Sequence, residues 1–272
     1  MKAIYFDTNI FYSIGFNVDD EVFNDVLCLA QSLEIERWAT PITIGEVEAG
    51  ISRRFAAVND AYQRISNIIQ RVTDDDYVNY LNIESLQNAK YQAIDEIKNF
   101  FAEKFTLIGY DSLDDSDVST IFKDYFSSSK PFGNGNKKAE FPDAFQLELI
   151  KRNIKTKEKM MIVTTDHDFV NCGKNFVIQK SLTKAKEELL QLWKKSKLAE
   201  YEAFYLSKIS PDMPADRLVS NDISDNGFLT QCMADEILWS LRKKNKIQLN
   251  INGIIYRGND KSRFVESVII VN

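Results

Sequence analysis

The feature that constrains this chain most is a short apolar segment near its start that ends abruptly in an acid. Ala3-Ile4-Tyr5-Phe6 is followed directly by Asp7-Thr8-Asn9. An apolar run bounded in this way predicts a buried β-strand that ends in a loop. In open parallel sheets the functional crevice lies beyond the carboxyl ends of the strands. We therefore expect Asp7 to lie at the mouth of such a crevice and Asn9 to cap the helix that follows.

Three later segments carry acids that can join the first one. Glu46 lies near the start of a long helical pattern, and Asp143 lies near the start of another. Asp166 and Asp168 follow an apolar strand pattern at 160–164. We expect these side chains to meet at the same edge of one sheet, although each motif alone is weakly specific.

Apolar periodicity predicts alternating strands and helices across the first 180 residues. Strand patterns occupy 3–6, 38–40, 105–110, 160–164 and 176–179, and helical patterns occupy 19–37, 44–72, 77–104 and 142–153. This alternation is typical of an α/β fold. We predict a central parallel β-sheet flanked by helices over residues 1–180, with a largely helical insertion at about 55–130.

The pattern changes after Ser181. A charged helical pattern extends to about Lys208, and a linker rich in Pro, Asp and Ser follows. A short helical pattern at 228–242 precedes three β-prone runs, with a strong hairpin signal at Asn252-Gly253. We expect residues 181–272 to form a second, smaller α+β unit, whose role the sequence does not reveal.

Composition excludes several kinds of catalytic site. His167 is the only histidine, and the three cysteines show no paired spacing. A zinc hydrolase needs several imidazoles or paired thiols, which this chain lacks, and a single histidine makes a nucleophile paired with histidine an unfavoured interpretation. Any hydrolytic chemistry must therefore be carried by carboxylates.

Charge limits how the chain could bind a polyanion. The formal net charge is −6 at pH 7, so the surface as a whole does not attract nucleic acid. Binding would need local basic groups or bound cations. Lys137 and Lys138 lie in a segment, 127–138, whose Ser, Gly and Asn content predicts a mobile loop. That loop could close over a phosphodiester substrate, and a solvated loop with incidental lysines is an equal alternative.

No apolar stretch approaches the roughly 18 residues that a membrane span needs. The N-terminal apolar run lacks the basic and hydrophobic regions of a signal peptide. We expect a cytoplasmic protein without membrane contacts.

Several acids gathered in one crevice would repel one another, and a bound divalent cation removes that cost. Ligation by carboxylates without His or Cys suits Mg²⁺ or Mn²⁺. One or two such ions can deprotonate a water molecule and neutralise the charge that develops on a phosphodiester.

The ordered set of acidic motifs resembles that of the PIN-domain nuclease family. The resemblance is carried by residues 4–9, 42–50, 142–144 and 164–169. Their order and chemistry agree with the family across residues 1–180. The long helical insertion and residues 137–143 are similar to the larger bacterial branch of the family, and residues 181–272 lie outside the resemblance.

The resemblance implies a metal-dependent endoribonuclease that hydrolyses RNA, with a role as a toxin or a defence effector among its possible uses. The implied catalytic, metal-binding acids are Asp7, Glu46, Asp143 and Asp166, with Asp168 as a competitor of Asp166. The implied supporting residues are Thr8, Asn9, Glu140, Thr164 and Thr165, and the implied substrate-binding residues are Lys137 and Lys138.

Other classes of protein remain open at this point. A haloacid-dehalogenase-type phosphatase would also begin with a strand ending in Asp, but it needs a second Asp where this chain has Asn9. A structure-specific DNA nuclease would use similar acids, and an inactive RNA-binding scaffold would keep the fold. The sequence also leaves open whether one or two ions bind, whether the chain forms a homodimer, and whether an antitoxin or another regulatory protein controls it.

Overall fold

The computed structural model describes residues 1–72, 83–132, 140–166, 169, 173–208, 219, 222, 229–243, 248–251, 254–256 and 267–269. The predicted site residues Lys137, Lys138 and Asp168 lie outside the described residues, as do His167 and the predicted hairpin turn at Asn252-Gly253. The chain divides into two compact units. The first comprises residues 1–18 and 36–181, and the second comprises residues 19–35 and 182–272.

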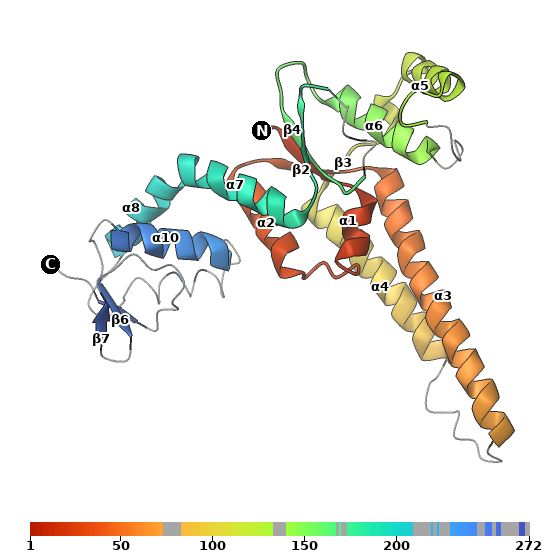
Figure 1. Cartoon of the computed structure of the whole chain (residues 1–272), viewed down its shortest axis with the longest axis horizontal. Helices are drawn as coiled ribbons and strands as arrows, with labels where there is room; N and C mark the ends of the chain where they lie inside the picture. Colours follow the sequence, from red (N-terminus) through yellow and green to blue (C-terminus); the bar gives the residue numbers. More distant parts are fainter. Residues whose placement is uncertain are drawn as a thin grey trace. The chain divides into compact units, whose positions relative to one another are not determined.

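The first unit is built on a five-stranded, entirely parallel sheet (Figure 1). Its strand order is β3-β2-β1-β4-β5. The strands are β1 (Ala3–Phe6), β2 (Glu36–Ala39), β3 (Thr106–Leu107), β4 (Met160–Val163) and β5 (Phe176–Gln179). The central strands β1 and β4 are buried along their whole length, as expected for a parallel sheet covered on both faces. The α/β fold with a parallel sheet is thus confirmed.

The register of the two central strands sets the position of the site. Phe6 of β1 pairs with Val163 of β4, so the next residues, Asp7 and Thr164, leave the sheet at the same level. From β1 the chain first adds β2 and β3 on one side of this strand, and it then adds β4 and β5 on the other side. A reversal of this kind opens a crevice at the carboxyl edge of a parallel sheet.

Helices begin near that same edge or cover the sheet. They are α1 (Thr8–Ser13), α3 (Pro41–Val72), α4 (Ile83–Lys104), the short 3₁₀ helix η2 (Tyr110–Ser112), α5 (Asp115–Ser127) and α6 (Phe141–Asn153). In Figure 1, α3 and α4 lie side by side as a long pair that extends away from the sheet. The segment predicted as a helical insertion also supplies β3, which pairs with β2 at the sheet edge.

Alternate residues of the strands pack into two different layers. Tyr5 and Ile162 lie in a buried cluster with Leu147 and Ile150 of α6. Phe6 points to the other face, where its ring lies 6.0 Å from the ring of Phe105, the residue that follows α4. The central sheet is therefore held from both sides, and each fully buried apolar side chain contributes about 1.5–3 kcal/mol.

In its described residues, the second unit combines helices with a small antiparallel sheet. Its helices are α2 (Glu21–Ser32), α7 (Leu182–Ser196), α8 (Leu198–Lys208) and α10 (Gln231–Lys243), and its strands are β6 (Gln248–Ile251), β7 (Ile254–Tyr256) and β8 (Ser267–Ile269). The sheet has the order β7-β6-β8, with both pairs antiparallel. No helix among the described residues is long and apolar enough to cross a membrane.

Two predicted elements have different boundaries in this unit. The helix predicted up to Arg37 ends at Ser32, and β2 already begins at Glu36, because Glu34 adopts a left-handed conformation with φ 57°. The single charged helix predicted up to Lys208 is wrong, since α7 ends at Ser196 and α8 begins at Leu198.

The break between α7 and α8 has a packing reason. The ring centroids of Trp193 and Tyr201 lie 5.3 Å apart. Eight residues of a straight helix would separate them by about 12 Å along its axis. The turn between the helices therefore allows both aromatic side chains to pack together, and Trp193 is completely buried.

Candidate metal centre

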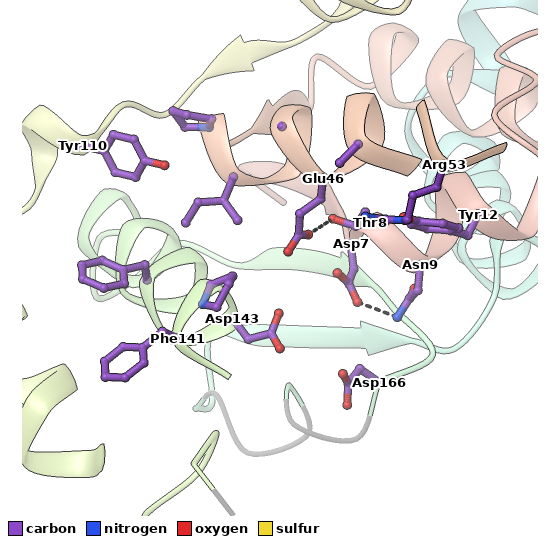
Figure 2. A pocket seen from close by; sticks show the side chains of 16 residues that line it. Asp7, Thr8, Asn9, Tyr12, Glu46, Arg53, Tyr110, Phe141, Asp143 and Asp166 are labelled. Atoms are coloured by element: carbon purple, nitrogen blue, oxygen red, sulfur yellow. Dashed lines mark hydrogen bonds between the residues drawn. The ribbon is translucent and has the colours of Figure 1, made fainter. Parts of the chain in front are cut away.

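The candidate site is a pocket of about 880 Å³ at the carboxyl edge of the parallel sheet. Four predicted acids line it: Asp7, Glu46, Asp143 and Asp166. They come from the end of β1, from α3, from the first turn of α6 and from the segment after β4. Figure 2 shows their carboxylates around one cavity. The structure thus brings together side chains that lie up to 159 positions apart in the sequence.

Asp7 is the most deeply buried of these acids, with a relative exposure of 5%. Its Oδ2 accepts hydrogen bonds from Thr164 Oγ1 and from Asn9 Nδ2, each at 2.6 Å. Burial raises the pKa of Asp7 to about 6, the Thr164 hydrogen bond opposes this shift, and repulsion by Asp166 and Glu46 adds to it. These neutral donors therefore hold the Asp7 carboxylate in place, but they bring no positive charge to offset its negative charge.

Asn9 does not cap the first helix as predicted. The helix begins two residues earlier than that cap would place it, at Thr8, so that Asp7 is the N-cap and Asn9 lies within the first turn. From there Asn9 Nδ2 also donates to Thr164 Oγ1 at 3.2 Å, and Asn9 Oδ1 accepts from the Thr165 backbone N–H at 3.4 Å. Asn9 thus connects the ends of β1 and β4 next to the pocket.

Glu46 lies in the second turn of α3, because that helix starts at Pro41. Its Oε2 accepts hydrogen bonds from Thr8 Oγ1 at 2.6 Å and from Gln146 Nε2 at 3.4 Å. The two donors belong to α1 and α6. Three helices therefore converge on one carboxylate.

Asp143 is the third residue of α6. The pKa of Asp143 is raised to about 7. Burial is the largest cause, and repulsion from neighbouring acids adds to it, in the order Asp7, Glu46, Asp166 and Glu140. The neighbouring charges that produce this shift are all carboxylates. Glu140 is the N-cap residue of α6, gives no side-chain cap to the helix, and lies outside the pocket lining.

The donor set fits a hard divalent cation. Carboxylate oxygens are the preferred ligands of Mg²⁺ and Mn²⁺, and repulsion among these acids is the cost that such an ion relieves. As the side chains stand, no three acids among the described residues are arranged to hold an ion. Binding one would require the carboxylates to turn toward one another.

Sequence reasoning did not single out several further residues of the pocket lining, among them Tyr12, Arg53, Tyr110 and Phe141. In Figure 2, Tyr110 and Phe141 lie on one side of the acids, and Arg53 and Tyr12 lie on the other. A signal for Arg53 was present, because it follows Glu46 by seven positions on one helix and so shares its face. No comparable signal existed for Tyr110, whose place depends on how the insertion folds.

Arg53 and Tyr12 are positioned by contacts between α1 and α3. Arg53 Nη2 donates a hydrogen bond to the Tyr12 hydroxyl. The Tyr12 side chain lies so close to α3 that a Cβ added to Gly50 would be 2.6 Å from the Tyr12 hydroxyl oxygen and 2.6 Å from Phe16 Cζ. Glycine at position 50 thus permits this close packing.

A parallel sheet with carboxylates gathered at its carboxyl edge defines a class of protein, the α/β enzymes that work with divalent metal ions. Within that class, a PIN-domain family model matches residues 4–169, more than half of the chain, and the chain belongs to the PIN-domain family. PIN domains are in general metal-dependent nucleases. Searches of curated proteins and of solved structures gave no match.

Proposed function

We propose that this protein is an endoribonuclease that hydrolyses RNA phosphodiesters with Mg²⁺ or Mn²⁺ held by Asp7, Glu46, Asp143 and Asp166. The observation that carries the proposal is the electrostatic state of the pocket, in which other carboxylates help raise the pKa of Asp143 to about 7. Groups so perturbed in a cleft are typical of functional sites. Without a cation these crowded carboxylates only repel one another, whereas a cation-binding site requires several carboxylates close together.

The neutral side chains around the acids have a supporting role in this proposal. Thr164 and Asn9 orient Asp7, and Thr8 orients Glu46, without cancelling either negative charge. A bound divalent cation would supply charge neutralisation at the phosphate and lower the pKa of a water molecule. The chain itself would contribute the carboxylate acceptors that hold the cation, and the cation would bind the substrate phosphate.

The flanks of the pocket suit an unpaired strand. Tyr110 is 52% exposed although it lines the pocket, and Phe141 lies on the same side. Exposed rings next to a nuclease site can stack on unpaired bases, which single-stranded RNA offers. Arg53, on the opposite side, can pair with a backbone phosphate. Arg53 would thus supply a local positive charge for substrate binding in a chain whose net charge is negative.

The proposal extends to the cell: the enzyme would act in the cytoplasm as a toxin or a defence effector that degrades cellular RNA, with an antitoxin as a candidate partner. What supports this part is the family resemblance of the motifs. Inducible expression in a bacterial host tests it. Growth arrest by the unchanged protein, relieved in the Asp143→Asn variant, is the expected result, and normal growth in both cultures would contradict the toxin role.

The decisive biochemical experiment compares end-labelled single-stranded RNA with DNA of the same sequence in the presence of Mg²⁺ or Mn²⁺. We expect RNA products with 5′-phosphate and 3′-hydroxyl ends, no cleavage in excess EDTA, and a more than roughly 100-fold loss of rate for Asp143→Asn. That loss should exceed the 10–100-fold typical of residues that only support a metal ligand.

Three outcomes would contradict the proposal. Products with 2′,3′-cyclic phosphate would show that the ribose hydroxyl is the nucleophile. Full activity of the double variant Asp7→Asn/Asp143→Asn would show that the acids are not needed. Cleavage of the DNA strand alone would make the enzyme a deoxyribonuclease.

A further inference from the structure

A line of buried polar groups connects the start of α3 to the carboxylate of Glu46. Its four members, Thr40, Thr43, Tyr5 and Gln146, are all completely buried. The successive distances are 2.9 Å from Thr40 Oγ1 to Thr43 Oγ1, 2.8 Å from Thr43 Oγ1 to Tyr5 OH, 2.5 Å from Tyr5 OH to Gln146 Oε1, and 3.4 Å from Gln146 Nε2 to Glu46 Oε2.

The direction of every bond in this line follows from the chemistry of its members. The amide oxygen of Gln146 can only accept, so the single hydroxyl proton of Tyr5 is donated to it. The Tyr5 oxygen must then accept from Thr43, and Thr43 in turn must accept from Thr40. All four donors thus point the same way, and the last of them, Gln146 Nε2, points at Glu46.

The opposite orientation of the Gln146 amide is unfavourable. It would place the amide oxygen against the Glu46 carboxylate, where two acceptors would face each other, and the orientation of an amide is set by its partners.

Stability of the fold does not require this line to be polar. Tyr5 lies within an apolar cluster that includes Leu147 and Leu149, neighbours of Gln146 on α6. Replacing both partners of a buried hydrogen bond by apolar groups of similar shape is close to neutral for stability. A role for the polar groups must therefore be sought at the end of the line, on Glu46.

We propose that Gln146 is a positioning residue, which fixes the Glu46 carboxylate for a divalent cation and is itself oriented by Tyr5. The proposal rests on the proposed function, since it requires Glu46 to be a ligand. Thr8 and Gln146 both bond Oε2, from two different helices. Within the described part of the chain these bonds leave Oε1 as the oxygen that is presented to the pocket.

The test measures Mn²⁺ binding to the full chain by titration calorimetry and by electron paramagnetic resonance, with no substrate present. Gln146→Met keeps the side-chain length and removes the donor. We expect its Mn²⁺ affinity to fall 10–100-fold, the range for residues that support a metal ligand. In a Glu46→Gln background the same replacement should have no further effect, because Gln146 acts through Glu46.

Two companion variants keep the test decisive. Tyr5→Phe removes the group that orients the amide, and we expect a smaller loss of Mn²⁺ affinity without loss of the folded state. Asn153→Leu is the matched control: it removes another amide from α6, one that bonds Ser112 Oγ and the Leu149 carbonyl instead of a pocket acid. Its Mn²⁺ affinity should equal that of the unchanged protein.

Failure of this inference differs from failure of the proposed function. If Gln146→Met caused equal losses in the unchanged protein and in the Glu46→Gln background, its role would be merely structural and the inference would be overturned. Unchanged affinity in both Gln146→Met and Tyr5→Phe would overturn it too. Absence of Mn²⁺ binding by the unchanged protein would overturn the metal site itself and the inference with it. Unaltered binding by Glu46→Gln would show that Glu46 is not a ligand and would overturn the inference alone.

Discussion

Asp7 and Asp143 are acids whose protons are held more tightly in the folded protein than in the unfolded chain. Their pKa values of about 6 and about 7 lie above the ordinary value of 3.8, chiefly because of burial. Between about pH 4 and pH 7 the folded protein without metal thus binds more protons than the unfolded chain, and its stability falls as pH rises through that window.

We expect this loss to amount to about 1–2 kcal/mol after allowance for screening by solvent. Urea unfolding in EDTA at a series of pH values measures it. Asp143→Asn should flatten the profile, and saturating Mn²⁺ should reverse its slope, because the cation binds the deprotonated acids. A stability that rises from pH 4 to pH 7 in EDTA would contradict the burial of these groups.

Tyr110 provides a residue-scale test of how substrate is bound. Tyr110→Ala in the Asp143→Asn background should weaken binding of single-stranded RNA by about 5–100-fold, because stacking of one base on an aromatic ring contributes about 1–3 kcal/mol. Fluorescence anisotropy measures the change. Phe126→Ala is the control, since Phe126 is 77% exposed but lies outside the pocket lining. Equal effects of the two variants would argue against stacking at Tyr110.

At the scale of elements, two glycines of α3 should respond differently to the same change. A Cβ at Gly45 would meet no atom within 4 Å, whereas one at Gly50 would collide with Tyr12 and Phe16. We expect Gly45→Ala to stabilise the protein by roughly 0.5–1 kcal/mol. Gly50→Ala should instead destabilise it by about 1 kcal/mol, because overpacking outweighs the gain in helix propensity. Thermal unfolding compares them, and equal shifts would contradict the close packing of α1 on α3.

Sequence patterns predicted the strands that are buried along their whole length. They did not predict features that depend on contacts between residues far apart in the sequence. Strands β1 and β4 could be predicted because each of their residues is buried and apolar. The acids could be predicted because each stands at the end of a strand or near the start of a helix. The role of Gln146 could not be derived in this way, since a polar residue within a helix acquires its partner only in the folded chain.

The same limitation explains why the prediction did not group residues 19–35 with the C-terminal part of the chain. The apolar face of α2 predicted a helix packed on the first strand, but an apolar face does not specify which surface covers it. In the structure the buried carboxylate of Asp25 pairs with Lys186 of α7, and Ser32 accepts a hydrogen bond of 3.0 Å from Trp193 Nε1. These contacts place α2 in the second compact unit.

At the scale of the whole molecule, this arrangement predicts what truncation would do. A chain cut after Ser181 keeps α2 but loses α7, so Asp25 loses its only ion-pair partner among the described residues. Breaking a buried ion pair on one side costs about 3–5 kcal/mol, and an apolar face is exposed as well. We expect the fragment 1–181 to aggregate or to unfold at a much lower temperature. Light scattering and thermal unfolding would show this, and a monomeric fragment of unchanged stability would contradict it.

The path of the chain has a final consequence for its biosynthesis. The chain leaves the first compact unit after Val18, returns to it at Glu36 and leaves it again after Ser181. Helix α2 emerges from the ribosome well before α7, and at typical rates of elongation about 150 residues take roughly 10–30 s to translate. During that interval the apolar face of α2 lacks α7, the helix that it contacts in the folded chain. Chaperones that bind exposed apolar helices would thus have their main opportunity there, before the last third of the protein is made.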